Sequence, residues 1–142
     1  MTLGFMIRGE VNEERLLKAV ARALGVPLNE VARFSIDSES DATILVEIIH
    51  RTAGFLTDVS LYFDPQRIPS IATWSSIDVA PPIAHDLEDE VLVSPPADDA
   101  YANAAYTWYL ITPDGKRFIA DELDLDQRGE VIEINRATLR LT

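Results

Sequence analysis

Two pairs of segments with alternating side chains, each pair separated by turn residues, constrain the fold most strongly. In residues 44–48 and 55–63, side chains suited to a buried face recur at every second position, which is the period of a half-buried strand. Residues 105–111 and 116–123 flank the Thr-Pro-Asp-Gly segment at 112–115, where proline presets the first turn angle and glycine supplies a positive φ. The sequence therefore predicts two antiparallel hairpins.

A short strand and a helix are expected before the first hairpin. Apolar side chains alternate over residues 3–7, as in a strand. Asn12 is a good N-cap for a helix that continues to residue 24, and Gly25 is suited to end it. We therefore predict an α+β fold, with one main N-terminal helix packed on a mainly antiparallel sheet and residues 1–142 forming a single domain.

Prolines are concentrated in the middle of the chain. Residues 64–100 hold six of the eight prolines. Because proline lacks a backbone N–H and disrupts the interior of helices and sheets, we expect only short regular elements there. After the second hairpin, two extended runs at 131–134 and 137–141 are expected to extend the sheet.

The negative charge gathers in the same proline-rich region. The formal net charge is −12, and residues 68–115 contain eight carboxylates, five aromatic residues and no lysine or arginine. A surface of this composition suits a strongly basic partner, because opposite charge raises the encounter rate and aromatic side chains supply buried anchors. The partner-binding residues that we predict are Asp86, Glu88, Asp89, Glu90, Asp98, Asp99, Trp74 and Tyr101.

What the sequence lacks argues against several classes of function. Without cysteine there are no disulfides and no thiolate metal sites, which is in keeping with a cytoplasmic protein. We expect no secretory signal peptide and no membrane span, since no apolar run is long enough. We also expect no metal and no cofactor. Nucleic acid and membrane surfaces are unfavourable partners for a chain of this charge.

Small size, a marked acidic balance, no catalytic set of residues and an α+β sheet together resemble the immunity proteins of bacterial contact-dependent growth-inhibition and polymorphic toxin systems. The resemblance is one of overall character and rests on no motif. It implies a cytoplasmic, non-enzymatic inhibitor that binds the C-terminal domain of a cognate toxin, often a basic nuclease, and covers its active or substrate-binding site.

A hydrolase-type enzyme is one alternative. His85 and His50 are the only histidines, and His85 is followed by Asp86 and Glu88, so three groups capable of proton transfer or metal binding stand close together. Their spacing matches no known site, and abundant carboxylates alone do not indicate catalysis.

A DNA-binding regulator is the other alternative. Residues 17–34 resemble a helix-turn-helix, because Ala21, Gly25 and Val31 stand at the spacing of that motif. Phosphate contacts supply most of the affinity for nucleic acid, and a segment with few bases on a strongly acidic chain is poorly suited to make them.

Overall fold

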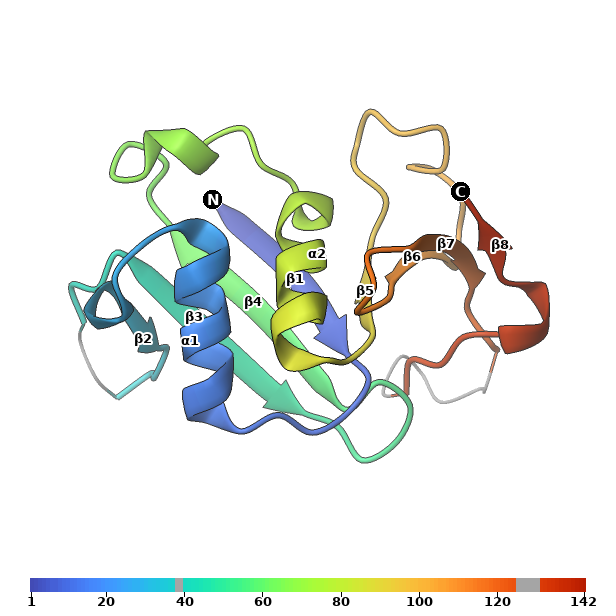
Figure 1. Ribbon diagram of the computed structural model, residues 1–142, viewed down its shortest axis with the longest axis horizontal. Helices are drawn as coiled ribbons and strands as arrows, with labels where there is room; N and C mark the ends of the chain where they lie inside the picture. Colours follow the sequence, from blue (N-terminus) through green and yellow to red (C-terminus); the bar gives the residue numbers. More distant parts are fainter. Residues whose placement is uncertain (38–39, 125–130) are drawn as a thin grey trace.

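The computed structural model describes residues 1–37, 40–124 and 131–142. The described strands are β1 (Thr2–Ile7), β2 (Val31–Arg33), β3 (Ile44–His50), β4 (Thr57–Phe63), β5 (Val91–Val93), β6 (Thr107–Ile111), β7 (Arg117–Asp121) and β8 (Arg140–Leu141). They form one sheet in the order β2-β3-β4-β1-β5-β6-β7-β8, in which only β2 and β3 pair in parallel. The described chain also forms two α-helices, α1 (Glu13–Leu24) and α2 (Ser76–Leu87), which lie in front of the sheet in Figure 1. The predicted α+β class with a mostly antiparallel sheet is confirmed.

Helix α1 begins and ends where the sequence predicts. The Asn12 side chain accepts a hydrogen bond from the N–H of Arg15, and Gly25 ends the helix with a φ of 70°. The apolar face buries Leu16, Val20 and other side chains against the sheet, so local capping and burial favour the same segment.

Both predicted hairpins are present. Strands β3 and β4 pair over their whole length, from Ile44 opposite Phe63 to His50 opposite Thr57. Strands β6 and β7 pair across the predicted turn, where Gly115 has a φ of 86°. Of the two C-terminal runs, the first contributes only single bridges and the second forms a 3₁₀ turn, η3 (Arg136–Thr138), followed by β8.

Helix α2 corrects the prediction that the proline-rich middle holds only short elements. The helix has 12 residues and contains Pro81 and Pro82 in its interior. A capping box formed by Ser75 and Asp78 starts it, and its apolar face is buried against α1 and the sheet. Burial of that face offsets the backbone hydrogen bonds that the two prolines cannot make.

The helix-turn-helix of the regulator alternative is not formed. After α1 the chain makes one 3₁₀ turn, η1 (Leu28–Glu30), and then enters β2. Val31 pairs with Ile44 and is buried in the core, so the residue expected to pack a second helix packs a strand instead. No recognition helix exists in residues 17–34, all of which the structure describes.

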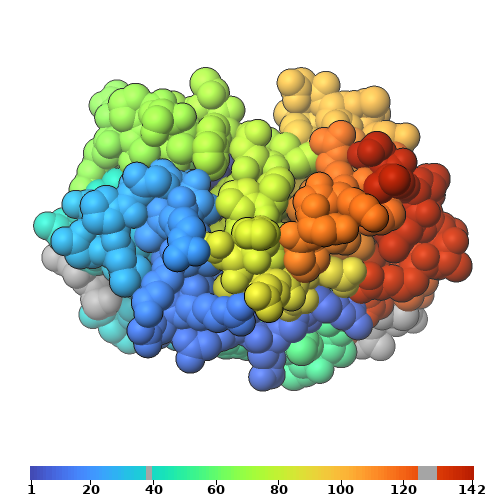
Figure 2. All heavy atoms as spheres, viewed as in Figure 1, coloured from blue at the N-terminus to red at the C-terminus, as the bar shows by residue number. Residues whose placement is uncertain are grey.

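The sheet has a core on each face. The larger core lies between the sheet and the two helices, whereas a smaller core on the opposite face is formed by Met6, Phe55, Leu92, Leu110, Ala120 and Ile134. The outline of the molecule is hollowed at the top of the view in Figure 2, between the segment around η2 (Pro69–Ile71) and the loop that joins β5 to β6. None of the described helices is long and apolar enough to cross a membrane.

Candidate partner-binding site

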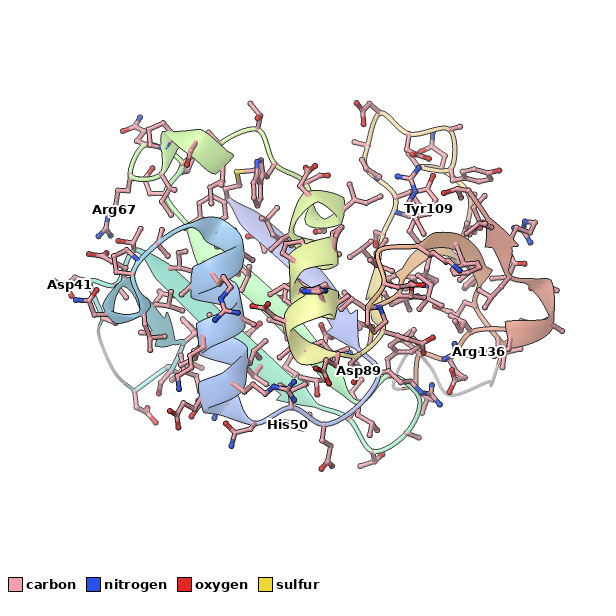
Figure 3. The ribbon with its side chains drawn as sticks, in the orientation of Figure 1. Asp41, His50, Arg67, Asp89, Tyr109 and Arg136 are labelled. Atoms are coloured by element: carbon pink, nitrogen blue, oxygen red, sulfur yellow. The ribbon has the colours of Figure 1, made fainter. Side chains whose placement is uncertain are left out.

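The predicted partner-binding residues lie in two separate groups. Asp86, Glu88, Asp89 and Glu90 lie at the C-terminal end of α2, whereas Asp98, Asp99 and Tyr101 lie on the β5–β6 loop, residues 94–106. Trp74 precedes α2 and packs partly buried against the larger core. In Figure 3, Asp89 lies beside the C-terminal end of α2, and Tyr109, which binds Asp99, lies beside the loop. The structure does not bring the two groups onto one surface.

Three of the four carboxylates at the end of α2 have partners inside the chain. Asp86 pairs with Arg22 at 3.2 Å, and Glu90 binds both terminal nitrogens of Arg136 at 2.6 and 2.7 Å. Asp89 accepts hydrogen bonds from the backbone N–H groups of Gly9 and Glu90. Glu88 is exposed, and its carboxylate forms no hydrogen bond or ion pair with the residues that the structure describes. These carboxylates therefore mainly hold distant segments together.

Asp99 is held by the buried phenol of Tyr109. The Tyr109 hydroxyl lies 2.8 and 2.9 Å from the two carboxylate oxygens, to which it donates its one hydrogen, and the backbone N–H of Tyr101 donates a further hydrogen bond at 2.8 Å. The pKa of Asp99 is lowered, mainly by the hydrogen bond from the Tyr101 N–H and to a smaller extent by that from Tyr109. The pKa of Tyr109 is raised, mainly by burial and to a smaller extent by its hydrogen bond to Asp99. The Tyr101 ring contacts Tyr109 edge-on at 6.3 Å. Neighbouring Asp98 is exposed.

The basic side chains of the described chain are all used internally. Eight lysines and arginines form ion pairs with carboxylates. Arg15 and Arg67 donate to backbone carbonyls, and the Arg117 guanidinium lies 4.7 Å from the centre of the Tyr109 ring. By contrast, five exposed carboxylates accept no hydrogen bond from any described residue: Glu10, Asp37, Asp41, Glu88 and Asp98. The excess negative charge therefore points outward.

A groove that the sequence did not reveal lies around Trp108, and Met6 and Leu92 of the smaller core form part of its lining. It consists of two hollows of about 370 and 300 Å³, both lined by Ser94 and Trp108, and we call it the Trp108 groove. The sheet opens there because pairing between β1 and β5 ends at Met6 and Leu92, and prolines at 95–96 lead the chain away. Side chains alternate between the two faces of the sheet along β6, so Trp108 lies on the face opposite to buried Tyr109. This alternation is the one sequence signal that indicates the groove.

The residues of the enzyme alternative do not converge. His85 is exposed on α2, and its neighbour Asp86 pairs with Arg22. His50 ends β3 and is also exposed. Within residues 1–37, 40–124 and 131–142, no three histidine, aspartate or glutamate side chains are grouped so as to hold a metal ion.

Comparison of the chain with protein-family models, with curated proteins and with solved structures finds no significant match.

Proposed function

We propose that this chain is an acidic, non-catalytic inhibitor that binds a basic protein domain, in the manner of an immunity protein against its toxin. One observation carries the proposal: every described lysine and arginine is engaged within the chain, whereas several exposed carboxylates are not. The field outside the molecule is therefore negative, which attracts a basic surface and repels phosphates and anionic membranes.

The β5–β6 loop is the contact region that we propose. It carries Asp98 and Tyr101, which are both exposed residues, Tyr101 to 36%. Asp99 and Tyr109 brace the loop from inside through their hydrogen bonds. A braced loop loses little conformational entropy on binding, and a half-exposed tyrosine is a common interface anchor. Glu88 lies in the other group of predicted residues and contributes only long-range attraction.

The inhibition that we propose acts at the β5–β6 loop. Inhibition there is steric and electrostatic: carboxylates of this chain pair with lysine and arginine groups that the partner otherwise uses to hold its substrate. For a nuclease partner those groups bind phosphate. The inhibitor acts in the cytoplasm and needs no cofactor.

Where an adjacent reading frame encodes a toxin-like domain, co-expression of that domain with this chain tests the function. Cells that produce the domain alone should stop growing, and cells that also produce this chain should grow. Protection should be lost with the double variant Asp98→Lys and Tyr101→Ala, and kept with Glu88→Lys, an exposed control with the same change of charge as Asp98→Lys. Loss of protection in a folded His85→Ala variant would instead support the enzyme.

A further inference from the structure

We propose that one hollow of the Trp108 groove, lined by Tyr106, Trp108 and Glu122, binds an arginine side chain of the basic partner. The inference rests on the proposed function, because it names the group of the partner that the groove receives. The hollow has a volume of about 300 Å³ and lies directly beneath the β5–β6 loop, since Ala102 and Ala104 of that loop also line it.

Pairing of β6 with β7 places an aromatic ring and a carboxylate together in this hollow. The two strands pair from Thr107 opposite Asp121, and the N–H of Glu122 donates to the carbonyl of Tyr106 at 2.8 Å. The indole Nε1–H of Trp108 donates to Oε1 of Glu122 at 2.9 Å. The carboxylate is therefore held at the wall of the hollow before any ligand enters.

The chemistry of the lining favours a cation with a flat shape. The hollow contains the carboxylate of Glu122 and no lysine, arginine or histidine among its lining residues, which are otherwise small or aromatic. A guanidinium is planar, keeps its charge at every accessible pH, stacks on aromatic rings and donates hydrogen bonds to a carboxylate. An arginine side chain can stack on the aromatic rings of the hollow and pair with its carboxylate. A neutral or anionic group cannot make both interactions.

Tyr106 has a conformation that stability does not explain. Its φ is 61°, in the left-handed region that is unfavourable for a bulky residue, and the residue is 72% exposed. A tyrosine held in this way gains little burial in return for its strain. Such strain is often retained at binding sites, and here it places an aromatic ring at the mouth of the hollow that receives the cation.

Titration with the amide of Nα-acetyl-arginine, followed by NMR of the indole N–H groups, tests the inference. The chain has two tryptophans, so Trp108 gives one of two indole signals and Trp74 gives an internal reference. We expect the Trp108 signal to shift in a saturable manner, and the citrulline analogue, which has the same shape without the charge, to shift it at least fivefold less. Glu122→Gln and Tyr106→Ala should each weaken arginine binding at least fivefold, whereas Glu88→Gln should leave it unchanged.

An unmoved Trp108 signal, equal shifts with citrulline, or unchanged binding in a folded Glu122→Gln variant would each overturn the inference. Its failure can be told apart from failure of the proposed function, because this titration uses the chain alone and co-expression uses the partner. Protection without arginine binding would leave the inhibitor and remove the arginine subsite. Arginine binding without protection would leave the arginine subsite and remove the inhibitor.

Discussion

Asp89 joins the end of α2 to the connection between β1 and α1: its Oδ2 accepts a hydrogen bond of 2.9 Å from the backbone N–H of Gly9. Its Oδ1 accepts a second bond, of 2.8 Å, from the N–H of Glu90. A side chain at position 9 would meet the carboxylate, because a Cβ there would lie 2.9 Å from Oδ2. This carboxylate therefore connects backbone segments that are far apart in sequence.

Replacement of Asp89 by alanine should destabilise the fold. Two backbone N–H groups lose their acceptor, which costs about 1 to 3 kcal/mol of the free energy of unfolding. Glu88→Ala is the matched control, because it removes the same charge from the preceding residue, which is exposed. This substitution should change the free energy of unfolding by less than about 0.5 kcal/mol. Chemical denaturation measures both. Equal effects of the two substitutions would contradict the structural role of Asp89.

Tyr109→Phe should make the protein less stable in a manner that depends on pH. Asp99 has a lowered pKa in the folded chain, so its ionised form stabilises the fold above the ordinary value of 3.8. That contribution is lost as the pH falls through the lowered pKa. The difference in unfolding free energy between the parent and Tyr109→Phe should therefore shrink below about pH 4. A difference that grows toward acid pH would contradict the assignment.

Tyr106→Gly should stabilise the protein. Glycine adopts the positive φ of this position without the clash that a Cβ causes, so the variant should gain about 1 kcal/mol. Tyr101→Gly serves as a control, because Tyr101 has no positive φ and packs against Tyr109. It should lose stability. Thermal unfolding measures both changes, and a destabilised Tyr106→Gly variant would show that the ring contributes to folding.

The chain should not bind duplex DNA at physiological salt. Its charge is −12, and Arg33, the base in the former helix-turn-helix candidate, pairs with Glu13 at 3.1 Å. Binding of a labelled duplex, followed by fluorescence anisotropy over a range of salt concentrations, provides the measurement. Salt-sensitive binding that disappears on Arg33→Ala would restore the regulator as an explanation.

Capping and turn residues predict those helices and hairpins whose structure depends mainly on neighbouring residues in the sequence. The caps at Asn12 and Gly25 and the turn before Lys116 lie within the segments that they control, so α1 and the β6–β7 hairpin could be predicted. Helix α2 could not, because burial of its apolar face by distant elements outweighs the effect of Pro81 and Pro82.

The candidate site depends on contacts across the chain, which the sequence does not show directly. Arg136, which neutralises Glu90, is 46 residues away along the chain. A segment of the sequence that contains no lysine or arginine can therefore still have basic side chains beside it in the folded chain. The Trp108 groove depends on where β5 leaves the sheet, and that position follows from pairing with β1 and β6. The composition of the sequence therefore predicts a basic partner. Only the fold shows which carboxylates are exposed and which are held by contacts within the chain.

We propose that exposed negative charge on the β5–β6 loop guides a basic protein partner to this chain. Stopped-flow association with a basic domain against which co-expression of this chain protects, at several salt concentrations, measures that guidance directly. The rate constant should fall steeply as salt rises, and Asp98→Lys should lower it more than Glu88→Lys, although both change the net charge equally. A rate that is independent of salt, or equal effects of the two substitutions, would contradict the claim.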